Sequence, residues 1–377
     1  MALAHDFTHL LKQAGFDFFS GVPCSFLTQV INQVIADPEL HYVPATSEGE
    51  AVALAAGAWL AGKQTVVMCQ NSGLGNMINP LTSLNAPFAI PILLIVTHRG
   101  KPGISDEPQH QQMGRITPEL LALLDIPARV LPANPAAMAA VVEQAAAQVR
   151  ERQQTVALIV EKGLFSEAAP EPEANLMLPG RAAALQQLLA LVDDQEILIA
   201  TTGKTGRELF TLADRQNNLY CVGSMGYASA LAQGIALHAP HRRITIIDGD
   251  GAALMHPGNM ATIGHLRSRN LIHLILNNNA YDSTGGQKTL ANEVDFVRLA
   301  QGMGYAHACR CSSLPQLAQA WRDARRQASG PVLLIINIAA GSLDNLGRPT
   351  VAPEQIARRL QRQIKESSLY DREFHAK

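Results

Sequence analysis

Short runs of Val, Ile and Leu recur along this chain between longer alanine-rich stretches, and this alternation restricts its fold more than any other feature. Seven runs stand out, at residues 65–69, 92–97, 157–161, 197–201, 244–248, 271–276 and 332–338. Continuous apolar runs of this length are typical of parallel strands that are buried on both faces. Their alternation with helical stretches predicts an α/β fold in which mainly parallel sheets are flanked by helices.

A break in this alternation predicts two domains. Residues 166–180 (SEAAPEPEANLMLPG) contain three prolines and no hydrophobic periodicity, as a linker would. We therefore expect one domain at residues 1–165 and another at 181–377, each near the common domain size. The charged stretch 353–377 has a helical pattern and is expected to form a surface helix and tail of the second domain.

Charge and cysteine content exclude several classes of protein. Thirty Lys and Arg against 32 Asp and Glu leave a net charge of -2, which provides no basic field for nucleic acid or an anionic membrane. Five scattered cysteines, of which only Cys309 and Cys311 are close in sequence, argue against a metal cluster and a disulfide framework. No apolar run reaches membrane-spanning length, and the N-terminal stretch lacks the pattern of a signal peptide, so we expect a cytoplasmic protein.

The segment 244–287 carries the clearest chemical signal. Gly249 and Gly251 flank Asp250, and such a turn allows close approach of a ligand, while the amides that follow, at Ala252 and beyond, suit a phosphate. Three consecutive asparagines, 277–279, follow after 25 residues, the length of one helix plus one strand. Carboxylate, amide and carbonyl oxygens at the carboxyl ends of two strands suit Mg²⁺ that also binds phosphate oxygens. A Gly-Asp-Gly sequence by itself is more often a plain turn.

The Gly-Asp-Gly turn and the asparagine run together resemble the cofactor motif of the thiamine diphosphate (ThDP) enzyme superfamily, in which Gly-Asp-Gly is followed at this distance by Asn-Asn. The resemblance implies two ThDP-binding-fold domains, a pyrimidine-binding domain (1–165) and a diphosphate-binding domain (181–377), without the middle domain of larger members. It implies Mg²⁺ ligands at Asp250, the side chain of Asn278 and the main-chain carbonyl of Ala280. Asn279 is the alternative to Asn278, which we prefer because the carbonyl ligand then follows two residues later.

Further cofactor contacts follow from the same resemblance. The segment 223–228 is similar to the family's stretch whose bulky apolar residue supports the bent cofactor, which assigns that role to Met225; a core methionine beside a turn is the competing interpretation. The segment 202–208 follows a predicted strand and could hold phosphate oxygens, although Lys204 and Arg207 equally suit solvated surface charges. The residues expected to contact the cofactor, besides the metal ligands, are Gly203, Ser224, Met225, Gly249, Gly251 and Ala252.

The first domain should supply a carboxylate to the N1′ nitrogen of the aminopyrimidine, which helps the cofactor lose its C2 proton. Ser47, Glu48 and Glu50 begin an alanine-rich helix in an S-x-x-E pattern, and helix capping accounts fully for Glu50. Glu48 followed by a helix of small residues resembles the family's activating glutamate. We therefore predict that Glu48 is catalytic, with capping as the alternative.

Several loops of the first domain follow predicted strands and are rich in Gly, Pro and hydrogen-bonding groups, which is typical of binding loops; they are residues 21–25, 70–76, 97–103 and 106–110. Together with residues 282–287, they are similar to the phosphonopyruvate decarboxylases and somewhat less similar to the sulfopyruvate decarboxylases. An anionic substrate tail needs cations or amide donors. The candidates for substrate binding are Ser25, Asn71, Arg99, Gln109 and His110. Other cations near these loops are Lys101, Arg115 and Lys288. Each of these three, like Arg99, is more often a plain surface charge. His110 is also a candidate catalytic residue for proton transfer, with a loop histidine of no function as the alternative.

The expected activity is thus ThDP- and Mg²⁺-dependent decarboxylation of a 2-oxo acid with an anionic tail, 3-phosphonopyruvate, with sulfopyruvate as the runner-up. A ferredoxin-linked 2-oxoacid oxidoreductase is less consistent because the cysteines form no cluster motif. A non-catalytic relative is disfavoured because Glu48, Asp250 and Asn278 are all present, and a nucleotide-binding Rossmann protein is disfavoured because no G-x-G-x-x-G opens a helix after the first strand. The resemblance implies a homodimer or higher homo-oligomer with active sites at subunit interfaces.

Overall fold

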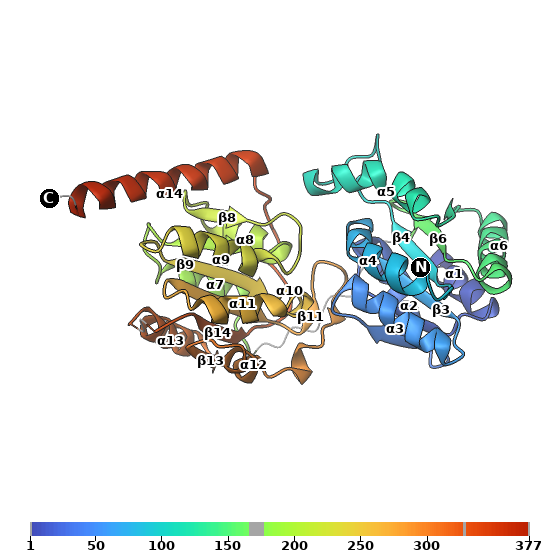
Figure 1. The fold of residues 1–377 in the computed structure, drawn as a ribbon, viewed down its shortest axis with the longest axis horizontal. Coiled ribbons are helices and arrows are strands. Elements are labelled where there is room, and N and C mark those ends of the chain that lie inside the picture. The colour runs from blue at the N-terminus through green and yellow to red at the C-terminus, as the bar shows by residue number, and fades with distance from the viewer. Residues whose placement is uncertain (1, 166–176, 327–328, 376–377) are drawn as a thin grey trace. The chain divides into compact units, whose positions relative to one another are not determined.

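The computed structural model describes residues 2–165, 177–326 and 329–375. The described residues form two compact units, a first unit of residues 2–165 with 283–287 and a second unit of residues 177–282, 288–326 and 329–375. Figure 1 shows that each unit is a sheet between layers of helices. The predicted α/β class with two mainly parallel sheets is confirmed, and the described residues contain no middle domain. Most of the predicted linker, 166–176, lies outside the described residues.

The first unit contains a six-stranded parallel sheet in the order β2-β1-β3-β4-β6-β5. Its strands are β1 (Phe18–Gly21), β2 (His41–Pro44), β3 (Thr65–Cys69), β4 (Leu93–Thr97), β5 (Ala128–Val130) and β6 (Val156–Val160). Its helices are α1 (Ala2–Gln13), α2 (Thr28–Ala36), α3 (Glu48–Leu60), α4 (Leu74–Pro80), α5 (Gln111–Leu123) and α6 (Pro135–Arg152), with short helices η1 (Ser25–Leu27), η2 (Asn71–Gly73), η3 (Leu81–Asn85) and η4 (Pro108–His110).

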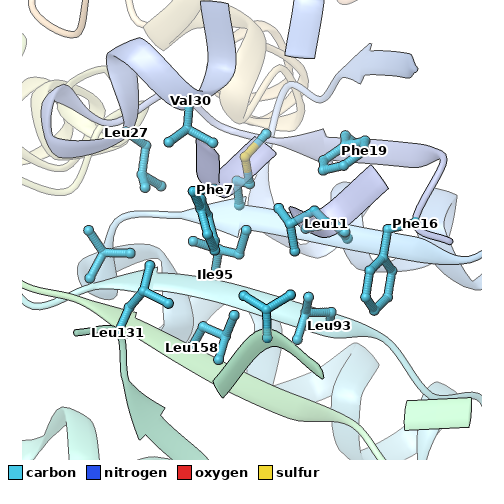
Figure 2. Close-up of a cluster of buried hydrophobic side chains, with 14 of the residues drawn as sticks. Phe7, Leu11, Phe16, Phe19, Leu27, Val30, Leu93, Ile95, Leu131 and Leu158 are labelled. Carbon is cyan, nitrogen blue, oxygen red and sulfur yellow. The ribbon is translucent and has the colours of Figure 1, made fainter. Parts of the chain in front are cut away.

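Alternating side chains of this sheet build two cores, one on each face, because successive residues of a strand point to opposite sides. One core joins α1, α2 and α6 to strand residues such as Leu93, Ile95 and Leu158. Figure 2 shows this core, with Phe7 and Leu11 of α1 lying over those strands. The other core joins α3, α4 and α5 to the alternate strand positions. This double burial explains why the strands appear in the sequence as continuous apolar runs.

The second unit repeats the architecture with a parallel sheet in the order β13-β14-β10-β9-β7-β8. Its strands are β7 (Ile197–Ala200), β8 (Asn218–Tyr220), β9 (Ile244–Gly249), β10 (Leu271–Asn277), β13 (His307–Cys311) and β14 (Val332–Asn337), and β11 (Ala280–Tyr281) pairs with β12 (Gln287–Lys288) as a separate two-stranded sheet. Its helices are α7 (Arg181–Leu189), α8 (Lys204–Leu212), α9 (Ala228–His238), α10 (Asp250–Met255), α11 (Gly258–Leu266), α12 (Phe296–Gly302), α13 (Leu314–Arg326) and α14 (Pro353–His375), with a short helix η5 (Ala291–Glu293).

The second unit also has a core on each face. One lies under α9, α11 and α12, and the other lies under α7, α8 and α13 and contains the fully buried Trp321. The predicted C-terminal helix is α14, which adds Ile356 and Leu360 to these cores. Within the described part of the chain, no helix combines the length and the apolar character that crossing a bilayer requires.

The short segment 283–287 belongs to the first unit, which the sequence did not predict. Thr28 on α2 donates its hydroxyl to the main-chain oxygen of Thr284 at 2.8 Å, and Gln287 donates to the side chain of Asn32 at 3.2 Å. Gly285 has a φ of +118°, and a Cβ there would lie 2.4 Å from the Thr28 methyl group. Glycine at this position therefore permits the close approach to α2.

Replacement of Leu158 by alanine tests the first core. Leu158 lies on β6 with no exposed surface, so Leu158→Ala should remove about 3 kcal/mol of unfolding free energy through lost burial and a residual cavity. Urea denaturation measures this change. Val130→Ala, at a side chain that is 51% exposed on β5, is the control and should stay within about 0.5 kcal/mol of the parent. Equal effects of the two changes would contradict this account of the core.

Candidate functional site

The register of β9 and β10 brings the two halves of the predicted cofactor motif together. Leu276 on β10 pairs with Gly249 on β9, so Asp250 and Asn277 follow directly at the same edge of the sheet. Asp250 begins α10, and Gly249 is its extended N-cap residue. The carboxyl edge of an open parallel sheet is where α/β proteins bind ligands.

Asp250 is a buried carboxylate, with 2% of the residue exposed. It accepts a hydrogen bond from the Thr289 hydroxyl at 2.5 Å and further bonds from backbone N–H groups, including that of Asn278. Burial raises the pKa of Asp250 to about 6, although these hydrogen bonds oppose the increase. A bound cation would favour the charged form of such a carboxylate.

The asparagine turn supplies neutral oxygens close to this carboxylate. Asn279 has a φ of +57°, and its backbone N–H donates to the side-chain oxygen of Asn277. The side-chain oxygen of Asn278 accepts from the N–H of Ala280 at 3.1 Å. Among the described residues, the buried side-chain oxygen of Asn279 has no hydrogen-bond partner. A buried acid beside amide and carbonyl oxygens is a donor set that fits a hard divalent cation.

Across residues 2–165, 177–326 and 329–375, no group of three or more His, Cys, Asp or Glu side chains is placed to hold a metal ion. Gly251 adds a steric constraint, since a Cβ there would lie 2.5 Å from the Tyr281 ring. The glycine thus permits the asparagine turn to pack against the start of α10.

The remaining predicted cofactor residues also lie at or near this edge. Gly203 follows β7, which neighbours β9, and has a φ of +92° as the N-cap of α8. Ser224 is exposed with a φ of +51°, and Met225 beside it is half-buried. A Cβ at Gly226 would lie 3.0 Å from the main-chain oxygen of Ala252, so the Met225 loop packs directly against α10.

In the first unit, Glu48 occupies the start of α3 at the end of β2 and is 6% exposed. Its side chain accepts a hydrogen bond from the Asn76 amide at 2.8 Å. Gly73 lies against the carboxylate, because a Cβ at that position would be 2.2 Å from Glu48 Oε1. Helix capping is carried by other side chains: Ser47 accepts from the N–H of Glu50, and the Glu50 carboxylate accepts from Thr46. Capping therefore does not explain the burial of Glu48.

Asn71 connects two of the predicted binding loops and is completely buried. Its amide nitrogen donates to the main-chain oxygen of Arg99 at 2.8 Å and to the Thr117 hydroxyl at 3.0 Å, and its oxygen accepts from the Arg99 N–H at 3.2 Å. These contacts engage both ends of the amide with the protein. The contacts of Asn71 therefore hold the Arg99 loop in place. Direct binding of substrate by Asn71 stays a prediction.

Arg99 is the centre of a cluster of candidate substrate residues. Asp106 accepts two hydrogen bonds from the guanidinium, at 2.8 and 2.5 Å, and Ser25 accepts a third at 3.3 Å. The guanidinium carbon lies 4.8 Å from the centre of the Phe26 ring. Burial disfavours ionisation of Asp106, but Arg99 and the N–H of Gly100 outweigh it and hold the pKa of this carboxyl below its usual value.

His110 ends η4 next to this cluster and is 9% exposed. Burial lowers its pKa to about 4; the positive charge of Arg99 adds to this decrease, and Asp106 opposes it. The imidazole is therefore neutral at neutral pH. Gln109, the preceding residue, is half-buried. The remaining candidate cations are engaged or exposed: Lys101 pairs with Glu161 at 2.5 Å, Arg115 donates to Gln112, and Lys288 is exposed.

Sequence reasoning missed several residues that shape the site. Asn76 and Gly73 lie in a predicted binding loop, but nothing in their spacing indicates a contact with Glu48. Thr289 lies just beyond the asparagine motif, and the sequence did not indicate that its hydroxyl bonds to Asp250. Asp106 was noted only as a loop residue, although a carboxylate seven positions from Arg99 could have suggested an ion pair.

Comparisons with known proteins match segments of both units to one enzyme family. The family model of the thiamine pyrophosphate enzyme N-terminal TPP binding domain matches residues 1–118, and that of the C-terminal TPP binding domain matches residues 204–336. A phosphonopyruvate decarboxylase from Streptomyces viridochromogenes is 43% identical, with 94% of this chain and 93% of the relative covered. One from Streptomyces hygroscopicus is 42% identical, with 95% and 93% covered. A sulfopyruvate decarboxylase from Methanosarcina acetivorans is 28% identical, with 83% and 85% covered. The chain therefore belongs to the thiamine pyrophosphate enzymes and, within them, to the family of the phosphonopyruvate decarboxylases.

Proposed function

We propose that this chain is a ThDP- and Mg²⁺-dependent decarboxylase that converts 3-phosphonopyruvate to phosphonoacetaldehyde and CO₂. The observation that carries this proposal is the 43% and 42% identity to two phosphonopyruvate decarboxylases over nearly the full length of each chain. The sulfopyruvate decarboxylase is more distant, at 28% identity, which makes sulfopyruvate the second candidate substrate.

Glu48 is proposed to bind the N1′ nitrogen of the aminopyrimidine. Its burial supports this role, because a carboxylate with little access to water interacts strongly with a partner that replaces the solvent. Asn76 donates to one side of the carboxylate and Gly73 leaves room for it, so both residues hold Glu48 in position. When bound, ThDP would supply an electron sink for the electron pair that the departing CO₂ leaves on the substrate carbon.

Asp250, the side-chain oxygen of Asn278 and the carbonyl of Ala280 are proposed to hold Mg²⁺ and, through it, the cofactor diphosphate. The buried carboxylate and the neutral oxygens of the asparagine turn support this assignment. Gly203 and the backbone amides at the start of α10 are proposed to approach the diphosphate, with Ser224 nearby. Met225 is proposed to support the bent cofactor, and its half-buried position at the edge of the sheet is compatible with that contact.

The phosphonate tail of the substrate is proposed to bind at the Arg99 cluster. A dianion would compete with Asp106 for the guanidinium, and Ser25 and Gln109 add hydrogen-bonding groups. Because His110 is neutral near pH 7, it is proposed to transfer a proton or donate a hydrogen bond rather than to act as a cation.

A comparison of three substrates tests the activity and the role of Glu48 together. Purified protein with Mg²⁺ and ThDP should release CO₂ from 3-phosphonopyruvate in preference to sulfopyruvate and pyruvate. Glu48→Gln should lower kcat at least 100-fold, the scale of general acid–base assistance. Glu50→Gln is the matched control, since Glu50 only caps α3, and should retain activity. Preference for sulfopyruvate would make sulfopyruvate the substrate. Full activity of Glu48→Gln would contradict the proposed catalytic role of Glu48.

We also propose a homodimer or higher homo-oligomer in which each active site uses Glu48 from one subunit and Asp250 from another. Mixing inactive Glu48→Gln and Asp250→Asn subunits after reversible dissociation should then restore about a quarter of the parent activity in a symmetric dimer, because half of the dimers contain one intact site. Sedimentation velocity measures the oligomer in parallel. A monomeric active enzyme, or mixing without recovery in a confirmed hybrid, would contradict this arrangement.

The pKa of His110 predicts a specific pH dependence. The unfolded chain should bind a proton at His110 near pH 6.5, whereas the folded chain binds it only near pH 4. The stability that a neutral His110 contributes is therefore present above pH 6.5 and is lost as the pH falls through this interval. His110→Gln should reduce the loss of stability between pH 6.5 and 4, measured by thermal unfolding. His5→Gln, at a side chain that is 68% exposed, is the control. NMR titration of His110 with a midpoint near 6.5 would contradict the prediction.

A further inference from the structure

The side chain of Asn278 is held by a second carboxylate, Asp282. Its amide nitrogen donates to Asp282 Oδ2 at 2.7 Å. An asparagine amide can be turned by half a rotation, which exchanges its oxygen and nitrogen, and only the oxygen can bind a cation. An ionised carboxylate only accepts hydrogen bonds, so Asp282 selects the orientation in which the amide nitrogen of Asn278 faces it.

Asp282 is itself fixed in place by buried partners. Its carboxylate is 4% exposed and is paired with the guanidinium of Arg181, which is 5% exposed at the start of α7. The N–H of Gly341 donates to the same oxygen at 3.3 Å, while the main-chain oxygen of Gly341 accepts from Arg181 at 3.0 Å. A buried carboxylate with these partners has little freedom to move.

Arg181 extends this network to α8 and to the loop after β14. Glu208 Oε1 lies 3.5 Å from the guanidinium and accepts from the N–H of Leu343 at 3.0 Å. Four segments that are distant in sequence are thereby tied together around one cation. Arg181 keeps Glu208 and the Gly341 oxygen as partners if Asp282 loses its charge, so the network does not depend on Asp282 alone.

We propose that Asp282 is a positioning residue for the metal-binding asparagine, with Arg181 as its anchor. Asp282 keeps the amide nitrogen of Asn278 on its own side. The amide oxygen then accepts from the N–H of Ala280 at 3.1 Å and keeps a second lone pair for the cation. Its negative charge also polarises the amide and makes that oxygen a stronger ligand, as carboxylates hydrogen-bonded to metal ligands do. This inference rests on the proposed Mg²⁺ site and extends it to the residues that orient its ligand.

The test measures ThDP binding to the full-length protein by equilibrium dialysis over a series of Mg²⁺ concentrations. Asp282→Asn has the same shape but offers both a donor and an acceptor, so residue 282 no longer selects one orientation of the Asn278 amide, and only the N–H of Ala280 still favours it. It should raise the Mg²⁺ concentration for half-maximal ThDP binding about 10- to 100-fold, the scale seen for the loss of such partners. The KM for the 2-oxo acid should stay unchanged once Mg²⁺ and ThDP are saturating.

Asp214→Asn is the matched control in the same unit. Asp214 accepts hydrogen bonds from Arg359 at 2.8 and 3.0 Å and from Tyr220 at 2.9 Å, so this change also breaks a carboxylate–guanidinium pair. It should lower the thermal midpoint of the metal-free protein and leave the Mg²⁺ requirement at the parent value. If Asp282→Asn does not fold, Arg181→Lys, which keeps the charge but loses the planar fork, is measured in the same way and should shift the Mg²⁺ requirement in the same direction.

An unchanged Mg²⁺ requirement in a folded Asp282 or Arg181 variant would overturn the positioning role while leaving the proposed metal site intact. Binding of ThDP to the parent protein that does not depend on Mg²⁺ would overturn the metal site and the inference with it. The parent titration therefore separates the two failures.

Discussion

Parallel hydrogen bonding on both sides of β10 is the constraint on which the second unit depends. Leu276 pairs with Gly249 on β9, and Asn277 pairs with Asn337 on β14. This register places Asp250 beside the asparagine turn and places the exit of β14 on the other side of the same turn. A shift by one residue would turn every side chain of β10 to the opposite face and separate these groups. The continuous apolar runs on both faces of the sheet oppose such a shift because each face buries its own core.

The two units share a further feature, which is buried carboxylates in the loops and helix starts that follow their strands. Glu48, Asp250 and Asp282 each lie almost out of contact with water, and each has a different set of donors. An amide holds Glu48, a hydroxyl and backbone N–H groups hold Asp250, and a guanidinium holds Asp282. The donor sets suit different roles. The neutral partners of Glu48 and Asp250 leave their negative charges available to a ligand, whereas Arg181 compensates the charge of Asp282 and leaves it to orient a neighbour.

Much of the fold could be predicted from the sequence because its strands are buried on both faces. All seven apolar runs are strands of the structure, and their ends agree within one residue. The seven runs do not include five strands of the two six-stranded sheets, namely β1, β2, β5, β8 and β13. β5 and β8 have only three residues and β1 and β2 only four, and the edge strand β13 (HACRC) contains the polar residues His307 and Arg310. A strand at an edge or of this length lacks the apolar run that marks a central one.

The sequence by itself determined the α/β class and the two cofactor-binding domains, and it predicted the motif residues Glu48, Asp250 and Asn278, because apolar periodicity and motif spacing are local properties of the chain. Only the tertiary structure decided which side chains hold them. Asn76 reaches Glu48 across 28 positions, Thr289 reaches Asp250 across 39, and Arg181 reaches Asp282 across 101. Such contacts depend on strand order, register and the packing of loops at one edge of a sheet, which no local pattern specifies. The physical reason is that a buried charge takes its partners from whichever segments the fold brings next to it.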